Sequence, residues 1–414
     1  MMNALLFWLI LMVLFFFAYT MGMRRVLSRF AAQSPARPTI PTEKLAAFES
    51  KLEPMMVIEG HKIVGDIIQI EGRLKGEPDS TFRQIREAFA DELVTPLLLE
   101  GGENNVRVVF LPEKAGEPAA EKPNWILHWL LFIATIATTT WAGALHAGVN
   151  LLNEPGRFAV GLPYSFGLML ILGAHELGHY FTAKAHRISV TPPFFIPVPF
   201  ALGTFGAFIR IKSRTPDRAA LFDVAVAGPL VGLVFAVPAL LIGLRYSQVI
   251  PANAPESLVH TGVSIDSSIL LGCLAKMSLG VPLLAGDRLL LHPLAFAGWL
   301  GLIVTALNLL PIGQLDGGHM SHALFGSRQA HGISIAALIL LFLLALFVWP
   351  GLMFWAFIVY FIAGTHDAPA ANDVTQLGAA RKALGYFTFL LLLLIIVPFP
   401  RAFYQTIGLH SPYL

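Results

Sequence analysis

The fold of this chain is decided by one stretch, SFGLMLILGAHELGHYF at residues 165–181, which lies inside an apolar segment from about Phe158 to Ala183. Positions i and i+4 share one face of a helix, so His175 and His179 can bind one metal ion together. Glu176 then lies beside the ion, where a carboxylate can act as a general base on water. Ionisable side chains at membrane depth are costly and mark a functional site. The stretch therefore predicts hydrolytic chemistry within a membrane.

The composition supports a membrane protein. Of 414 residues, 56% are hydrophobic and only 13% are charged, and the mean hydropathy is +0.68. A soluble domain is about half apolar and a quarter charged. The net charge of +2, without a dense basic cluster, gives no reason to expect a nucleic-acid partner. The single cysteine, Cys273, excludes an intramolecular disulfide and a multi-cysteine metal site.

Apolar runs long enough to cross a bilayer recur along the chain, since about 20 residues span the hydrocarbon. We predict a polytopic α-helical membrane protein with about eight transmembrane helices. The expected spans are 4–22, 125–145, 159–184, 219–243, 293–313, 331–349, 351–364 and 384–400. A further apolar stretch, Leu270–Leu284, is interrupted by Gly and Pro, and it either lies in the interface or re-enters the membrane.

The basic residues predict the orientation. Arg24, Arg25 and Arg29 follow the first apolar run instead of preceding it, which indicates an uncleaved anchor with the N-terminus outside. Basic residues next to the later spans fall on the cytoplasmic side of one consistent topology, so we expect the histidine motif near the cytoplasmic face. No Arg- and Ser-rich transit peptide precedes the anchor, which favours a bacterial cytoplasmic membrane.

The polar region after the anchor predicts a small cytoplasmic α/β domain at 24–111. Asp79-Ser80 is expected to cap a helix that runs through Phe82, Ile85, Phe89 and Leu93. Residues 55–70 alternate apolar and polar residues loosely, and strands are expected at 94–99 and 106–111. Its neighbours are an N-terminal anchor at 1–23, a Pro-, Glu- and Ala-rich linker at 112–123 and a membrane domain at 124–414, whose catalytic core is about 159–320.

Residues 190–209 are apolar but contain Pro192, Pro193, Pro197 and Pro199, so they cannot form a spanning helix. Irregular backbone at membrane depth is tolerated where protein buries it or where it lines a cavity. We predict a re-entrant loop or β-hairpin beside the metal site. Its edge at 203–209 is suited to pair with an unwound substrate segment, which makes Gly203, Phe205 and Gly206 candidate substrate-binding residues.

Two histidines leave a zinc site incomplete, because catalytic zinc usually has three protein ligands and an open position. The candidate for the third is Asp316, which ends an otherwise apolar run from Ala295. Pro311 is expected to kink or break that helix, and Gly317 and Gly318 allow the backbone to approach closely. The predicted topology brings this segment to the depth of His175.

These motifs together resemble one family. HELGH at 175–179 with N-x-x-P at 308–311 and D-G at 316–317 is similar to the paired signature of the site-2 protease family of intramembrane zinc metalloproteases. The segments 203–207 and 223–229 add likeness to the branch that lacks a PDZ domain and contains plant plastid proteases and cyanobacterial relatives. The resemblance covers about residues 55–400. His319 stands where many relatives carry arginine, so that position differs from the family pattern.

The resemblance implies roles for five residues. His175, His179 and Asp316 would be ligands of one Zn²⁺ per chain, and Glu176 would be the catalytic acid/base. Asn308 would stabilise the developing oxyanion or orient the substrate. The implied activity is cleavage of peptide bonds in or near transmembrane segments, close to the cytoplasmic face, in regulated intramembrane proteolysis. The partners would be transmembrane protein substrates and the lipid bilayer.

Simpler interpretations remain open. The histidines could be buried core residues, Asp316 could cap a helix, and Asn308 could bind backbone freed by Pro311. Broken helices and intramembrane polar residues also mark a membrane transporter or channel with a metal site, although transport has no need of Glu176 next to the first ligand. An inactive scaffold would have lost a ligand or the glutamate, and this chain keeps them. His319 and His322 could support the ligands from behind.

Overall fold

A computed structural model describes most of the chain after residue 41. The described residues are 42–102, 105–112, 123–199, 202–250, 263–264, 268–279, 288–347, 351–365 and 367–397. The predicted N-terminal anchor, with its orientation, and nearly all of the predicted linker lie outside these residues. The division into domains at 23, 111 and 123 therefore stays a prediction.

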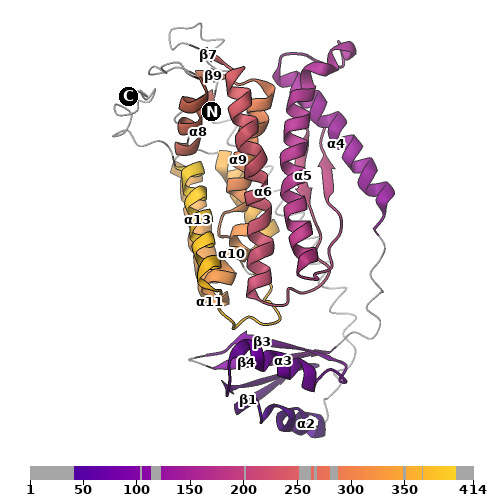
Figure 1. The fold of residues 1–414 in the computed structure, drawn as a ribbon, viewed down its shortest axis with the longest axis vertical. Coiled ribbons are helices and arrows are strands. Elements are labelled where there is room, and N and C mark those ends of the chain that lie inside the picture. Colours follow the sequence, from indigo (N-terminus) through magenta and orange to yellow (C-terminus); the bar gives the residue numbers. More distant parts are fainter. Residues whose placement is uncertain are drawn as a thin grey trace.

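Helices form the larger of two parts of the molecule (Figure 1). In that part α6 lies at the centre, where it packs against α5, α9 and α10. The helices are α4 (Trp125–His146), α5 (Leu162–Ala185), α6 (Arg218–Arg245), α8 (Ile269–Leu279), α9 (Pro293–Asn308), α10 (Asp316–Phe325), α11 (Ser327–Phe347), α12 (Gly351–Ile358) and α13 (Ala379–Ile396), with the short helices η1 (Pro155–Gly161) and η3 (Val359–Ala363).

Five of the described helices are long and apolar enough to cross a membrane: α4, η1 with α5, α6, α11 and α13. The predicted count of eight is therefore not confirmed. The expected span 293–313 is wrong at its end, because α9 stops at Asn308 and Pro311 lies in the turn that follows. A ring without an N–H cannot continue the helical hydrogen bonds. By contrast, Pro229 and Pro238 lie inside α6 without ending it.

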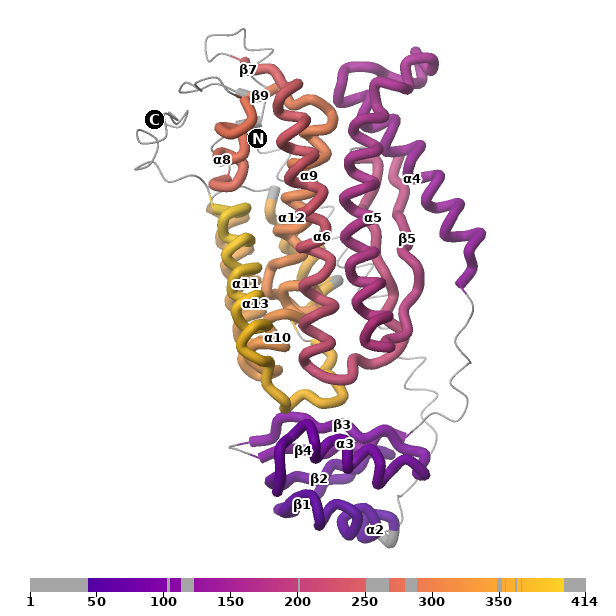
Figure 2. Tube along the Cα trace, in the orientation of Figure 1, coloured from indigo at the N-terminus to yellow at the C-terminus, as the bar shows by residue number. Residues whose placement is uncertain are grey.

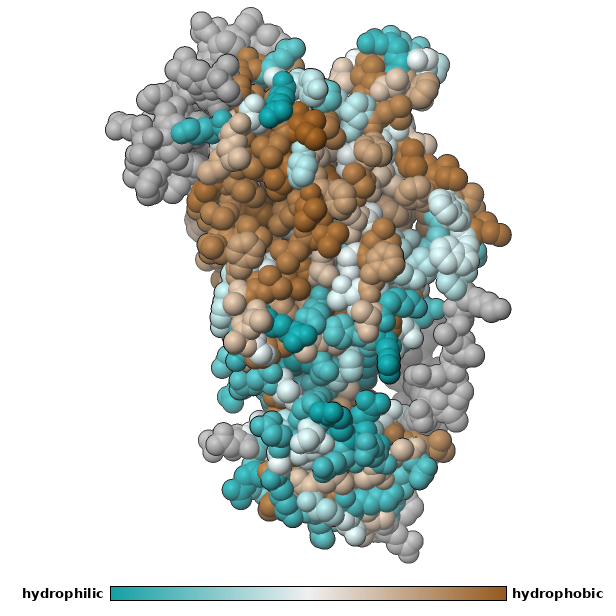
Figure 3. All heavy atoms as spheres, in the orientation of Figure 1, coloured by the Kyte–Doolittle hydropathy of each residue, from teal (hydrophilic) through white to brown (hydrophobic). Residues whose placement is uncertain are grey.

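The outer surface of the helices is apolar. Figure 3 shows a broad hydrophobic band over the helical part and a hydrophilic region toward the α/β part. Large apolar side chains are exposed on the helices, including Phe166, Phe181, Val234, Leu340, Phe347 and Leu393. Exposed contiguous apolar surface of this extent is expected where lipid, not water, is the solvent.

The second part is a small α/β domain at the hydrophilic end (Figure 1). Its antiparallel sheet has the order β1-β2-β4-β3, and three packed rings, of Phe48, Phe89 and Phe110, join the helices to the sheet with centroids 4.5–4.9 Å apart. The elements are α2 (Thr42–Leu52), β1 (Met56–Val64), β2 (Ile67–Leu74), α3 (Pro78–Ala88), β3 (Val94–Glu100) and β4 (Val106–Pro112).

The structure corrects three details of this domain. The helix begins at Pro78 with Glu77 as N-cap, not at Asp79-Ser80, because proline is favoured in the first helical turn. Leu93 is 72% exposed and does not extend the apolar face. The stretch 55–70 reaches across two strands, which turn at Gly65, whose φ of 62° suits glycine.

The predicted β-hairpin is present. Strands β5 (Phe194–Pro197) and β6 (Thr204–Phe208) pair antiparallel and lie beside α4 and α5 (Figure 2). The Tyr164 hydroxyl donates to the carbonyl of Leu202 at 2.9 Å, which ties the hairpin to α5. A small sheet at the other end of the helices has the order β7-β9-β8, from β7 (Gln248–Ile250), β8 (Val263–Ser264) and β9 (Arg288–Leu290).

Candidate metal centre

The two motif histidines lie on one face of α5, as their spacing predicts. Both are buried, and their Nε2 atoms are 3.0 Å apart. On His179 the Nδ1–H donates to the carbonyl of Val224 at 2.8 Å. That bond fixes the ring orientation and leaves the Nε2 lone pair for a metal, which is the usual arrangement for a ligating histidine.

Asp316 completes a group of three donors. Its Oδ2 atom lies 3.3 Å from the Nε2 atoms of both His175 and His179. Among the described residues these three are the group of histidine and carboxylate side chains placed to hold a metal ion. A tetrahedral zinc with bonds of about 2.0–2.1 Å keeps its donors roughly 3.3 Å apart. The donor types and their spacing therefore fit zinc.

The turn before Asp316 brings the carboxylate to the histidines. The chain leaves α9 at Asn308 and starts α10 at Asp316, so Asp316 begins a helix and does not end a span as predicted. Gly313 has a φ of 48°, a backbone conformation that suits glycine. A Cβ on Gly317 or Gly318 would collide with the carbonyls of Leu309 or Gly313, so both glycines are needed for this tight approach.

Two glycines on α6 lie directly against the histidine rings, a role that was not predicted for them from the sequence. A Cβ on Gly228 would lie 2.5 Å from Cδ2 and Cε1 of His179, and one on Gly232 would lie 3.3 Å from Nδ1 of His175. On α5, a Cβ on Gly178 would in turn meet the carbonyl of Ala227 at 2.9 Å. The i, i+4 glycine spacing on an apolar helix was the signal that could have indicated this close packing.

Glu176 and Asn308 both lie at the donor group. Glu176 is buried on α5, and the backbone of Ile209, just after β6, lies close to its carboxylate. Asn308 is the last residue of α9, and its Nδ2 lies 3.3 Å from Nε2 of His175. The structure therefore brings together all five residues for which the sequence predicted a metal-binding or catalytic role.

The three candidate substrate residues differ in their surroundings. Gly203, with a φ of 81°, is buried against α4, where a Cβ would lie 2.6 Å from the carbonyl of Thr138. Its own carbonyl accepts from the Thr138 hydroxyl at 2.7 Å. The Phe205 side chain is 69% exposed, and a Cβ on Gly206 would meet no atom within 4 Å. Phe205 and Gly206 are accessible, whereas Gly203 holds the hairpin on α4.

A second charged cluster lies near this end of α6. Asp223 accepts from Nε and Nη2 of Arg381 at 2.7 and 2.8 Å, and His186 Nε2 is 3.0 Å from it. Asp223 therefore joins α13 and the end of α5 to α6. Asp223 lies in the resemblance segment 223–229, but its partner could not be predicted from the sequence, because Arg381 lies 158 residues away.

Comparison with known proteins agrees with this geometry. The sequence profile of peptidase family M50 matches residues 163–349, which contain all five central site residues. The chain is 30% identical to "Probable zinc metalloprotease EGY2, chloroplastic" of Arabidopsis thaliana over 81% of its length and 61% of the relative. It is 34% identical to the EGY1 proteins of Arabidopsis thaliana and Oryza sativa, again over 81% of its length and over 66% and 63% of theirs. No solved structure matches the chain.

These relatives correct one expectation and confirm another. Their names place them in the chloroplast, which contradicts the prediction of a bacterial cytoplasmic membrane. That prediction depended on the lack of a transit peptide before residue 4, and the chain spans only 61–66% of the length of these relatives. The resemblance to site-2 proteases is confirmed: residues 163–349 match peptidase family M50, and the relatives are named as probable zinc metalloproteases.

Proposed function

We propose that this chain is an intramembrane zinc endopeptidase. It hydrolyses peptide bonds in or near transmembrane segments, close to the face that carries the α/β domain. The observation that supports this most directly is the donor group of His175, His179 and Asp316, whose spacing of 3.0–3.3 Å fits one zinc. Glu176 is buried next to His175 on the same helix. The family match and the names of the relatives support the same activity.

Each residue has a role in that reaction. When bound, zinc supplies a Lewis acid that acidifies water and polarises the substrate carbonyl. A carboxylate oxygen of Glu176 takes one proton from the attacking water and delivers it to the leaving amine nitrogen. The hydroxyl adds to the carbonyl carbon as the C–N bond breaks. The Nδ2 of Asn308 donates to the oxygen on which negative charge develops.

The hairpin is the proposed substrate guide. A helical substrate hides its amides in hydrogen bonds, so it must unwind before cleavage. A segment lying along β6 would replace those bonds with strand pairing. The exposed side chain of Phe205 and the open space at Gly206 support contact there. Because the backbone of Ile209, just after β6, lies close to Glu176, this edge leads toward the proposed catalytic carboxylate.

The substrates are therefore transmembrane proteins within a lipid bilayer. We keep eight spans as the proposed topology, with α9, α12 with η3, and the 4–22 anchor added to the five long helices. Helix α9, of 16 residues, packs against α5 and α6 and is shielded from lipid, so it does not need the length of a lipid-facing span. By likeness to the relatives, a plastid membrane is the proposed location.

The first experiment measures zinc per chain in detergent for the wild type and Asp316→Ala. We expect about one zinc in the wild type and a large loss in the variant, because one of three ligands is removed. Glu176→Gln should keep its zinc and lose cleavage of a transmembrane substrate. A wild type that binds no supplied zinc would overturn the proposal, and one that binds zinc but cleaves no transmembrane substrate would favour metal transport instead. A Glu176→Gln variant that cleaves normally would overturn the role of Glu176 as the catalytic acid/base.

A further inference from the structure

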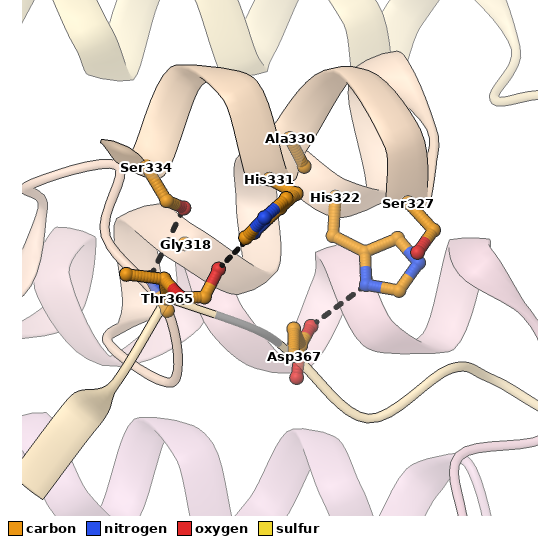
Figure 4. Close-up of a pocket in the computed structure, with 9 residues that line it drawn as sticks. Gly318, His322, Ser327, Ala330, His331, Ser334, Thr365 and Asp367 are labelled. Carbon is orange, nitrogen blue, oxygen red and sulfur yellow. Dashed lines mark hydrogen bonds and ion pairs between the residues drawn. The ribbon is translucent and has the colours of Figure 1, made fainter. Parts of the chain in front are cut away.

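A network of ion pairs starts on the helix that carries Asp316. His322, on α10, is 1% exposed and lies between two carboxylates (Figure 4 shows one of them). Its Nδ1 is 2.9 Å from Asp367 and its Nε2 is 2.9 Å from Asp373. Because a carboxylate accepts at each nitrogen, both nitrogens donate and the ring is a cation. His319 Nδ1 also lies 2.9 Å from Asp367, close enough for an ion pair but not aligned for a hydrogen bond.

The same network of ion pairs continues to the α/β domain. Asp373 is 1% exposed, and its second contact is Nε of Arg218, the first residue of α6, at 3.4 Å. Arg218 is 3% exposed and pairs through Nη2 with Glu100, the last residue of β3. Glu100, Arg218, Asp373 and His322 therefore link the edge of the α/β sheet to α10 without a gap.

Backbone pairing supports this link. β3 is an edge strand, and the segment 371–373 lies beside it in parallel. The N–H of Leu98 donates to the carbonyl of Ala371 at 2.7 Å, and the N–H of Asp373 donates to the carbonyl of Leu98 at 2.8 Å. On its other side the segment bonds to Thr215 and Pro216, just before α6, at 2.9 and 3.0 Å. The α/β domain is thus docked by β-strand addition.

We propose that this network of ion pairs positions Asp316 and makes zinc retention depend on docking of the α/β domain. The inference rests on the proposed function, because it assigns Asp316 as a zinc ligand. Helix α10 is only 10 residues long, with Asp316 at its first position and His322 six residues later. A shift of His322 therefore moves the carboxylate as well. Metal bonds tolerate displacements of only about 0.2 Å.

The removal of one partner from a buried charged pair leaves the other charge uncompensated, so the segment must rearrange. Asp373→Asn affects the centre of the network of ion pairs, and Glu100→Gln affects its end at the α/β domain. The Glu100 side chain is 38% exposed, so its replacement leaves the fold intact. Glu71→Gln is the matched control, because Glu71 pairs with Arg107 at 2.6 Å in the same sheet but has no part in the docking contact.

The test measures the rate at which the zinc-loaded full chain, in detergent, releases zinc to excess colorimetric chelator. We expect release to accelerate about tenfold or more in Asp373→Asn and Glu100→Gln, which is the effect typical of groups that support metal ligands. Glu71→Gln should match the wild type. The rates are compared far below the unfolding temperature of the metal-free protein, where a merely structural role leaves release unchanged.

The outcomes separate the two proposals. Wild-type release rates in both Asp373→Asn and Glu100→Gln would overturn this inference and leave the proposed function standing. A wild type without zinc would overturn the proposed function, and this inference with it. If Asp373→Asn does not fold, Glu100→Gln decides alone. Equal acceleration in Glu71→Gln would also overturn the inference, because the effect would then come from the sheet in general.

Discussion

Gly228→Ala tests the metal centre by changing a residue that binds nothing itself. A Cβ at this position would lie 2.5 Å from two carbon atoms of the His179 ring and closer still to Nε2, the atom that faces the metal. Gly232→Ala is the matched control on the same helix. Its Cβ would lie 3.3 Å from Nδ1 of His175, a tight contact that small adjustments relieve.

The structure sets the size of the effect. Ordinary van der Waals contact begins at 3.4 Å, so the ring of His179 and α6 must separate by about 0.9 Å at least. That displacement is several times the ~0.2 Å that a metal–ligand bond tolerates. The ring cannot retreat freely, because its Nδ1 is bonded to Val224 on the same α6 helix. We therefore expect zinc affinity to fall by more than the ~10–100-fold typical of substitutions in groups that support a metal ligand.

The assay is zinc content after dialysis against a weak chelator, with thermal unfolding of the metal-free protein measured in parallel. Gly228→Ala should lose most of its zinc, and overpacking should cost about 1–3 kcal/mol of stability. Gly232→Ala should keep most of its zinc. A folded Gly228→Ala protein with wild-type zinc content would refute the close packing of α6 on His179.

Three further outcomes follow from the structure. Glu176→Gln should keep about one zinc while cleavage falls by about 10²–10⁴-fold, the share typical of a general base; a metal-depleted variant would contradict this. Burial lowers the pKa of His322, but hydrogen bonds with Asp367 and Asp373 outweigh it and raise that pKa to about 9. Relative to a pKa near 6.5 in the unfolded state, the raised pKa of His322 contributes about 3 kcal/mol to the free energy of unfolding. This contribution is fully present below pH 6.5 and is lost as pH rises through 9. Thermal unfolding measured from pH 6 to 10 should show this loss of stability in the wild type and not in His322→Gln. Thr138→Val removes the bond to the Gly203 carbonyl and should cost about 1 kcal/mol of stability with zinc content unchanged.

Local spacing predicted the parts of the site that one helix or one turn determines. The i, i+4 histidines and the intervening glutamate follow from helix geometry alone. The break after Asn308 followed from Pro311, although the structure turns Asp316 from the end of one helix into the start of another. Two short apolar segments separated by the turn-rich residues 101–105 were enough to predict β3 and β4, but the loose alternation over 55–70 did not reveal the turn at Gly65 within the first strand pair.

Packing between distant segments could not be predicted in this way. That Gly228 faces His179 depends on which helix lies against α5, and sequence periodicity does not carry that information. The charges on Glu100, Arg218 and Asp373 are far apart along the chain, with 118 residues between the first two and 155 between the last two. The count of eight spans is not confirmed for a related reason, because a helix such as α9 that is covered by its neighbours need not have the length that lipid demands.

The position of Asp316 explains how a charged ligand is accommodated near a membrane. In the middle of a spanning helix a carboxylate would be desolvated on all sides. At the first turn of α10 it instead meets the positive end of a helix dipole and two imidazole rings. The same placement puts the ligand on a short helix that is attached, through His322 and Asp373, to residues outside the spanning helices. A ligand held in this way is stabilised locally and remains open to control by the α/β domain.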